Sequence, residues 1–336
     1  MEIVYLTDIH DNLKRLRHVI QDTRADLYVI SGDLIYKAFF TEDKLYEFVS
    51  LQEEFFYYLV RKKIRGTPSE LARSIIRMTE DFPSGYLTKA RRYQELFAKA
   101  ASNMKEKYLI LKKLVEKYAK AEVLFLPGNY DMDLQYTALD TYDIHKKERE
   151  FKGVRFSGYG GAPIATSGIP ELVSVIFYEY TVNGKLHSEP MEFFQKQKPD
   201  VLLLHNPAYA TLDKIPSHGH IGSLGVRQYI DDYEPALALS GHVHSDCGIM
   251  KINNTYCINP SNFGAVDTMD GHDEGGLFCR LFLYKKESKT VFQGLVLYKY
   301  SGTHILPVLE VNIKDGKLVE KVLHEQIYNE TGSFIR

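Results

Sequence analysis

The sequence predicts an α/β fold in which helices cover a parallel sheet. A short apolar run at residues 3–6 indicates a buried strand, and residues 26–30 indicate a second one. Apolar residues at helical spacing lie between these two runs. Two strands joined by a helix within the first 33 residues form a βαβ unit, whose strands are parallel. A parallel sheet is buried on both faces, so further helices are expected on each side of it.

The helix of this unit follows Asp11 in the chain. Its apolar residues Leu13, Leu16, Val19 and Ile20 fall on one face. An aspartate side chain can accept the free N–H groups at a helix start, so we expect Asp11 to cap this helix.

Residues 36–120 have a different pattern and predict a helical insertion after the second strand. Apolar residues recur at helical spacing over 45–64 and 93–118, without a strand pattern. The segment Thr67-Pro68-Ser69-Glu70 is typical of a helix start, with Thr as the N-cap. The insertion either packs on the sheet or on a second copy of the chain, giving a homo-oligomer, or it forms a lid over a site.

The sheet resumes after the insertion with apolar strands at 122–126, 154–156, 201–204 and 236–239. The segment from about 249 to 336 is rich in strand patterns. Strands are expected at 277–284, 291–299, 306–313 and 317–323, with a hairpin turn at Asp315-Gly316. Because the chain has no repeat and no low-complexity linker, one domain over 1–336 with an insertion fits better than two independent domains.

Composition narrows the classes of function. The 336 residues are 44% apolar and 26% charged, with a formal net charge of −2, which is ordinary for a globular protein. The balance of charge gives no reason to expect a nucleic-acid-binding protein. The sequence shows no signal peptide and no apolar run long enough to span a membrane, so we expect a cytoplasmic protein without a membrane partner.

Potential metal ligands lie at or just beyond the ends of the predicted strands. The seven are Asp8, His10, Asp33, Asn129, His205, His242 and His244. In an open α/β sheet these strand ends share one edge, where ligands bind. Oxygen and imidazole donors together suit Zn, Mn or Fe. The sequence therefore predicts a metal site at this edge.

These residues resemble the motifs of the calcineurin-like metallophosphoesterase superfamily in order and in strand context. That superfamily has the blocks D-x-H, G-D, G-N-H-D/E, a single His and G-H-x-H. The corresponding blocks here are Asp8-Ile9-His10, Gly32-Asp33, Gly128-Asn129-Tyr130-Asp131, His205 and Gly241-His242-Val243-His244. The resemblance covers roughly 1–35 and 120–265, and it implies a four-layer αββα sandwich.

The resemblance also implies two divalent transition-metal ions, which could be Mn, Fe, Zn or Ni, with Mn favoured. The first ion would be held by Asp8, His10, Asp33 and His244. The second would be held by Asp33, Asn129, His205 and His242, with Asp33 bridging. In such a centre a metal-bridging hydroxide attacks the phosphorus of a small phosphoester.

Tyr130 departs from the superfamily pattern. The superfamily has a His at this position, which contacts the phosphate and can protonate the leaving group. A phenol with a pKa of about 10 is a poorer general acid at neutral pH. Either the substrate needs less proton donation or another group supplies the proton. His218 and His220 are candidates, the alternative being that both lie in a solvated loop.

Three functions follow from these observations. The favoured one is a phosphoesterase in which Asp33, Asn129, Tyr130 and His220 are the candidate catalytic residues, acting on a small phosphodiester or nucleotide. A second is a binding or scaffold protein on the same fold, in which Tyr130 marks lost catalysis. A third is a nuclease, which would need a basic groove, whereas the chain has only scattered clusters such as Arg61-Lys62-Lys63.

Overall fold

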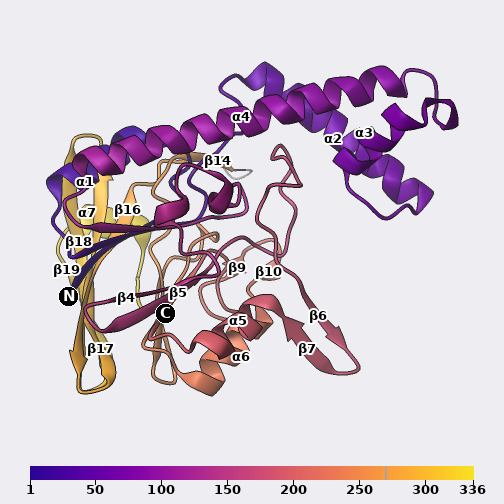
Figure 1. Cartoon of the computed structure of the whole chain (residues 1–336). Helices are drawn as coiled ribbons and strands as arrows, with labels where there is room; N and C mark the ends of the chain where they lie inside the picture. The colour runs from indigo at the N-terminus through magenta and orange to yellow at the C-terminus, as the bar shows by residue number, and fades with distance from the viewer. Residues whose placement is uncertain (269–270) are drawn as a thin grey trace.

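Two sheets stacked face to face form the centre of the molecule, as a computed structural model of residues 1–268 and 271–336 shows (Figure 1). The first sheet has seven strands. In spatial order they are β19 (Lys317–Val322), β18 (His304–Lys314), β17 (Lys289–Ser301), β16 (Leu277–Lys286), β1 (Glu2–Thr7), β2 (Leu27–Ser31) and β3 (Glu122–Leu126). The neighbours β1, β2 and β3 are parallel, so their carboxyl ends lie at one edge.

The second sheet has six strands. In spatial order they are β12 (Gly248–Ile252), β13 (Thr255–Asn259), β11 (Leu237–Leu239), β8 (Val201–Leu204), β5 (Val154–Tyr159) and β4 (Glu148–Phe151). The four central strands, β13, β11, β8 and β5, are parallel. Each sheet therefore contributes a set of loops that leave the carboxyl ends of parallel strands.

Helices cover the outer face of each sheet. The first sheet carries α1 (Leu13–Asp22) and the second half of the longest helix of the insertion, and the second carries α5 (Glu189–Gln197) and α6 (Leu224–Tyr233). The remaining elements are short and lie in the loops or near the C-terminus. They are β6 (Glu179–Val182), β7 (Lys185–Ser188), β9 (Lys214–Ile215), β10 (Gly219–His220), β14 (Val266–Thr268), β15 (Gly271–Asp273), α7 (Glu325–Thr331) and 3₁₀ turns at 79–81, 134–136 and 140–142.

Alternating side chains of β1 show why four layers form. Ile3 and Tyr5 point into the core between the two sheets, whereas Val4 and Leu6 point into the core beneath the helices. A strand that is apolar on both faces is stable only between two covering layers. The αββα sandwich expected from the sequence is thus confirmed.

The expected role of Asp11 as a helix cap is wrong. The N-cap position of α1 is Asn12, which makes no side-chain capping bond. Asp11 has a left-handed backbone, with φ of 63°, and its carboxylate turns away from the helix. It accepts hydrogen bonds from the backbone N–H groups of Tyr36 and Lys37 instead. Asp11 therefore joins the loop after β1 to the loop after β2.

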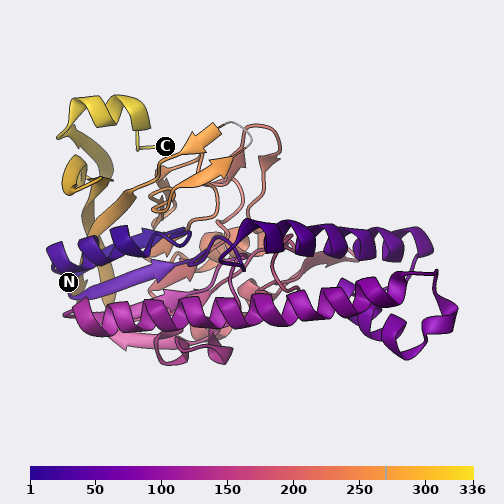
Figure 2. The same ribbon diagram turned by 90° about the horizontal axis from the view of Figure 1, so that it is seen from above.

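The insertion between β2 and β3 consists of α2 (Glu42–Lys62), α3 (Pro68–Arg77) and α4 (Tyr86–Tyr118). Seen from above, α2 and the first part of α4 run side by side and project beyond the sheets, with α3 at the far end (Figure 2). We call α2, α3 and this part of α4 the arm. With 33 residues, α4 is about 50 Å long, and its second half covers the first sheet with Tyr108 and Leu111 buried.

Aromatic packing and capping stabilise the arm. Phe48 of α2 stacks on Tyr93 of α4 with ring centroids 5.2 Å apart. At the start of α3, Thr67 and Glu70 exchange the two hydrogen bonds of a capping box, with Pro68 at the first helical position, as expected from the sequence.

Hairpins complete the two sheets. The antiparallel pairing of β16 with β1 adds the C-terminal strands to the first sheet, and Asp315-Gly316 turns between β18 and β19 as expected. Outside these sheets, the two-residue turn Asn183-Gly184 joins β6 to β7, which form a separate two-stranded sheet. Asn-Gly is a strong hairpin signal, although no hairpin was expected at these residues. Among the helices of 1–268 and 271–336, none combines the length and apolar character needed to cross a lipid bilayer.

Candidate metal centre

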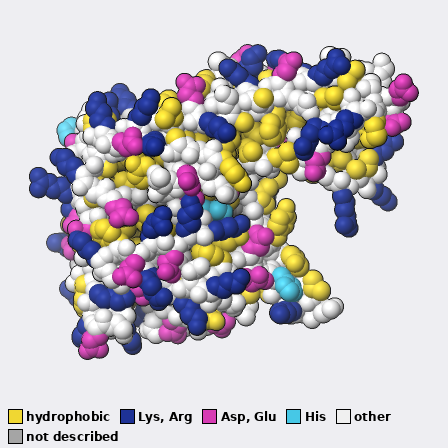
Figure 3. All heavy atoms as spheres, in the orientation of Figure 1, with side chains coloured by type: hydrophobic (Ala, Val, Ile, Leu, Met, Phe, Trp, Pro, Cys, Tyr) yellow, Lys and Arg dark blue, Asp and Glu magenta, His cyan; other side chains and the backbone are white. Residues whose placement is uncertain are grey.

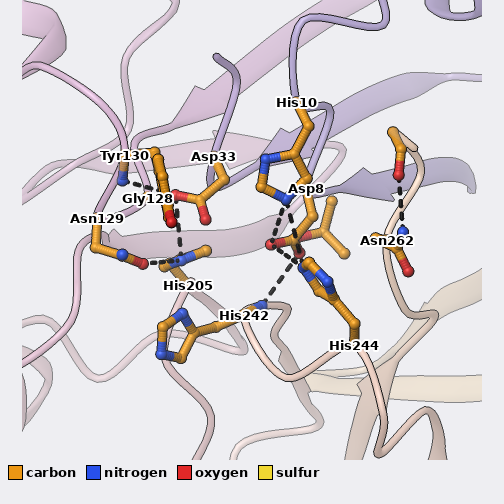
Figure 4. Close-up of polar contacts among 12 residues, drawn as sticks. Asp8, His10, Asp33, Gly128, Asn129, Tyr130, His205, His242, His244 and Asn262 are labelled. Carbon is orange, nitrogen blue, oxygen red and sulfur yellow. Dashed lines mark hydrogen bonds and ion pairs between the residues drawn. The ribbon is translucent and has the colours of Figure 1, made fainter. Parts of the chain in front are cut away.

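All seven predicted donors meet at the edge where the parallel strands of both sheets end (Figure 4). The loops after β1, β2 and β3 bring in Asp8, His10, Asp33 and Asn129 from the first sheet. The loops after β8 and β11 bring in His205, His242 and His244 from the second. The site is therefore built between the two sheets, and neither sheet alone contains it.

The first group of donors contains Asp8, His10 and His244. Nε2 of His244 lies 3.2 Å from Oδ1 of Asp8 and 3.4 Å from Nε2 of His10. The other carboxylate oxygen of Asp8 accepts hydrogen bonds from the Thr7 hydroxyl, at 2.6 Å, and the His242 N–H, at 3.1 Å. These bonds fix the Asp8 carboxylate, so Oδ1 is directed at both imidazoles.

The second group contains Asp33, His205 and His242. Nε2 of His205 lies 3.5 Å from Oδ1 of Asp33 and 2.8 Å from Oδ1 of Asn129. The Asn129 amide nitrogen donates to the Thr166 hydroxyl at 2.7 Å, which turns the amide oxygen toward His205. Asp33 falls within this second group, and its bridging role remains a prediction.

Several donors have a left-handed backbone. The φ angles are 54° at Asp8, 44° at His10, 42° at Asp33 and 66° at His242. Non-glycine residues rarely adopt this conformation, and such residues cluster at functional sites. In this site the left-handed conformation turns the donor side chains away from the strand direction and toward one another.

Three motif glycines allow the loops to approach closely. A Cβ at Gly32 would lie 1.9 Å from Nδ1 of His205. One at Gly128 would lie 2.1 Å from Oδ1 of Asp33, and one at Gly241 would lie 2.0 Å from the Thr7 hydroxyl. Any larger residue would collide with a donor or with its support, so the glycines of the motifs are a steric requirement.

Bound cations would neutralise the buried carboxylates of the site. Burial by itself would raise the pKa of Asp8, but His244 and the other imidazoles lower it below its usual range. Burial, Asp8 and Asp131 raise the pKa of Asp33 well above its usual range. An uncompensated pair of buried carboxylates is unfavourable, and a bound cation would relieve it.

Three of the four imidazoles have the protonation state that metal binding requires. Burial lowers the pKa of His10 to about 3 and that of His242 to about 4, and it lowers the pKa of His205 well below its usual range. Burial also acts to lower the pKa of His244, but the hydrogen bond and charge of Asp8 raise it above its usual value. Neutral imidazole is the form that binds a metal. Nδ1 of His10 and Nδ1 of His205 are buried without a hydrogen-bond partner. The donor set therefore fits two divalent cations.

Asp131 supports the site, a role that the sequence did not assign although the residue lies in a motif. Its buried carboxylate accepts from the N–H groups of Leu34, Ile35 and Gly128 and from the Tyr108 hydroxyl of α4. It thereby joins the loops after β2 and β3. No signal in the sequence pointed to Thr166, which orients Asn129 from a distant loop.

Tyr130 lies beside the donors. Its backbone N–H donates to Asp33. Its ring packs edge-on against His10, with centroids 6.0 Å apart, and at a tilt against Tyr36. Burial, followed by the charge of Asp33, raises the pKa of Tyr130 to about 12. The phenol is therefore an even weaker acid here than in water.

The two other candidate proton donors, His218 and His220, make their contacts outside the metal centre. Nδ1 of His220 is 2.6 Å from Oδ1 of the buried Asp213, and its ring packs against Tyr209. His218 is exposed and bonds to Ser217 in the β9–β10 turn. Among the contacts described for these two imidazoles, none reaches a predicted metal ligand.

Comparisons with known proteins agree with this geometry. The family model for calcineurin-like phosphoesterases matches residues 93–246. The uncharacterized protein MJ1162 of Methanocaldococcus jannaschii is 28% identical over 159 residues, which are 45% of this chain and 69% of that protein.

A solved crystal structure is similar in fold, with a TM-score of 0.53 and 15% identity, covering 89% of this chain and 99% of that one. Purple acid phosphatase PPD1 from yellow lupin (Lupinus luteus) has a TM-score of 0.41 and 12% identity, covering 91% of this chain and 52% of that one.

The family match and the site geometry complement each other. The matched range contains the blocks at 128–131, 205 and 241–244 but begins after the first two. The structure places Asp8, His10 and Asp33 against the donors of the matched range. The chain therefore matches the calcineurin-like phosphoesterase family over 93–246, and the donors outside that range complete the same site.

Proposed function

We propose that this protein is a binuclear metal-dependent phosphoesterase that hydrolyses a small phosphodiester or nucleotide. The observation that carries the proposal is the pair of neighbouring three-residue groups, each with one carboxylate and two imidazoles. Two adjacent sites of this composition suit Mn, Fe or Zn, and we favour Mn. Bound there, the two cations would polarise the phosphoryl group and lower the pKa of a water molecule.

The residues around the cations have separate roles in this proposal. Asp8, His10 and His244 hold one cation, and His205, His242 and Asn129 hold the other, with Asp33 shared. The carboxylate of Asp33 is itself held by the Tyr130 N–H at 2.9 Å. Thr166 positions the Asn129 amide so that its oxygen, and not its nitrogen, faces the cation.

Tyr130 favours diesters over monoesters in this proposal. A monoester dianion carries more charge than a diester, so it gains more from an imidazolium beside the metals. A phenol whose pKa is about 12 supplies neither a cation nor a proton at pH 7. A diester has less charge to neutralise and is expected to tolerate Tyr better.

His220 is the proposed alternative proton donor. Asp213 is completely buried, and its contact with Nδ1 orients the imidazole so that Nε2 is available. The role would require the β9–β10 hairpin to move toward the bound substrate. His220→Gln should then lower kcat for an alkyl diester, whose leaving group needs a proton, more than for a nitrophenyl diester.

The test of the main proposal is metal analysis combined with hydrolysis assays. Protein reconstituted with Mn should contain two metals per chain and hydrolyse a chromogenic diester. Asp33→Asn should lose one metal or more and reduce kcat by at least about 10³-fold, because the shared charge is removed. Intact activity with one metal or none would contradict the proposal. Two bound metals without any hydrolysis would instead favour the binding-protein alternative.

A further inference from the structure

We infer that a pocket between the arm and residues 163–171 binds a neutral aromatic group of the phosphoester substrate. This inference rests on the proposed function and adds a class of substrate to it. The pocket has a volume of about 290 Å³. That is roughly twice a 150 Å³ cavity that accommodates benzene, so one aromatic ring fits.

Aromatic and apolar side chains form the pocket. Phe56 and Tyr57 of α2 lie on one side with Pro68 of α3, and Ala165 and Thr166 lie on the other. The two aromatic rings pack edge to face with centroids 6.0 Å apart, yet Phe56 remains 53% exposed and Tyr57 64% exposed. Hydrophobic side chains also gather where the arm meets the body, above a notch in the surface (Figure 3). Contiguous exposed apolar surface of this kind is typical of ligand-binding grooves and other interaction sites.

The pocket adjoins the metal centre. Thr166 lines the pocket and accepts the hydrogen bond of Asn129 at 2.7 Å, and Oδ1 of Asn129 lies 2.8 Å from His205. One side chain therefore separates the pocket wall from the second group of donors. A phosphoester held at the metals could extend its non-reacting part past Thr166 toward the arm.

The polar groups of the pocket select the occupant. Among the described residues that line it, none is Lys or Arg, whereas Glu53 and Glu171 are acidic. An occupant with a second phosphate would be repelled. Both Gln52 and Glu171 already bond within the protein, so their polar atoms need no ligand. The remaining surface suits an uncharged ring.

The arm holds the pocket in shape. Gln52 of α2 donates to the Ile169 carbonyl at 3.0 Å and accepts from the Gly168 N–H at 2.8 Å. Glu171 accepts from the Ser69 N–H and the Tyr93 hydroxyl. Because these bonds already join the loop to α2, α3 and α4, little ordering is needed when a ligand binds.

Calorimetry with phosphonates tests this inference without catalysis. We would measure Kd on the Mn-loaded protein for phenylalkyl phosphonates, from benzyl to 4-phenylbutyl, each against the alkylphosphonate of the same chain length. At the chain length that reaches the pocket, the ring should tighten binding about tenfold, because its apolar surface is buried. Phe56→Ala should reduce this ring preference to about threefold or less.

A matched control is Tyr46→Ala, which removes an aromatic ring that is 66% exposed on the same helix but does not line the pocket. It should leave both the ring preference and the binding of the alkylphosphonates unchanged. If alkylphosphonates bind but no chain length shows a ring preference, or if the preference survives Phe56→Ala, the subsite is wrong and the metal site stands. If alkylphosphonates fail to bind the metal-loaded protein, the proposed function fails and the inference falls with it.

Discussion

Gly32 shows how a single residue limits the metal centre. It has φ of 70°, and its missing side chain leaves the room that the His205 imidazole occupies. The same motif supplies Asp33, so one turn provides both a ligand and the space for a ligand from the other sheet. The Gly-Asp pair of the sequence motif is therefore explained by packing as well as by metal chemistry.

Gly32→Ala should show how much the collision with His205 costs beyond the strain of a left-handed backbone. The matched control is Gly153→Ala, since Gly153 has φ of 78° but a Cβ added there would meet no atom within 4 Å. The control should lose about 1–2 kcal/mol of unfolding free energy from backbone strain alone. Gly32→Ala should lose at least about 3 kcal/mol and bind less Mn, because His205 must move. Urea unfolding and metal analysis measure both, and equal losses would contradict the steric role.

Tyr130 is expected to set the preference between diesters and monoesters. Tyr130→His should raise the ratio of kcat/KM for an alkyl phosphate monoester to that for a diester by about tenfold or more, because general-acid assistance is worth about 10²–10⁴-fold. Tyr130→Phe serves as the control, since it keeps the ring packing against His10 and removes only the hydroxyl. An unchanged ratio in Tyr130→His with full metal content would exclude Tyr130 as the selectivity element.

Among the elements, α4 connects the arm to the loops that carry the predicted metal ligands of the first sheet. At its middle, Nζ of the nearly buried Lys107 lies 2.6 Å from the Asp11 carboxylate and 2.7 Å from the Lys37 carbonyl. The next residue, Tyr108, donates to Asp131. One turn of this helix thus supports the loops after β1, β2 and β3. Removing the entire insertion would uncover the first sheet as well as the site.

Lys107→Met on α4 should weaken metal binding, although Lys107 is not a metal ligand. The change keeps the apolar stem but leaves Asp11 without its cation, so we expect a loss of about 1–3 kcal/mol in stability and severalfold weaker Mn binding. Lys112→Met on the same helix breaks only a surface pair with Glu116 at 3.7 Å and should cost less than about 0.5 kcal/mol. Chemical unfolding and Mn titration distinguish the two, and similar effects would rule out a special role for Lys107.

For the whole molecule, the metal centre lies where the two halves of the sandwich meet. Donors from β1, β2 and β3 face donors from β8 and β11. Cations bound between them would link the two sheets directly. The centre should therefore contribute to global stability as well as to chemistry.

Removal of the metals should destabilise the whole sandwich. A ligand present at 100 times its Kd stabilises the folded state by about 2.7 kcal/mol. Treatment with a chelator should accordingly lower Tm by several degrees, and Mn should restore it. Asp33→Asn, which lacks a ligand for this link, should respond much less. A wild-type Tm that is insensitive to the chelator would show that the metals do not join the sheets.

The sequence by itself determined the features that depend on local patterns. Buried strands are visible as apolar runs, so 122–126 and 201–204 were predicted at the bounds that the structure has. The capping box at Thr67 and the turn at Asp315-Gly316 follow from residue chemistry alone. The seven donors were found because each follows a strand, and parallel strand ends meet at one edge.

Only the tertiary structure decided the features that join distant segments. The partners of Asp11 lie 25 residues or more away, so its role at the junction of two loops could not be read from the neighbouring helix. Thr166 acquires its role solely by meeting Asn129, 37 residues earlier. The pocket between the arm and this loop arises for the same reason. Local spacing specifies strands, helices and turns, whereas contacts across the chain depend on how those elements pack.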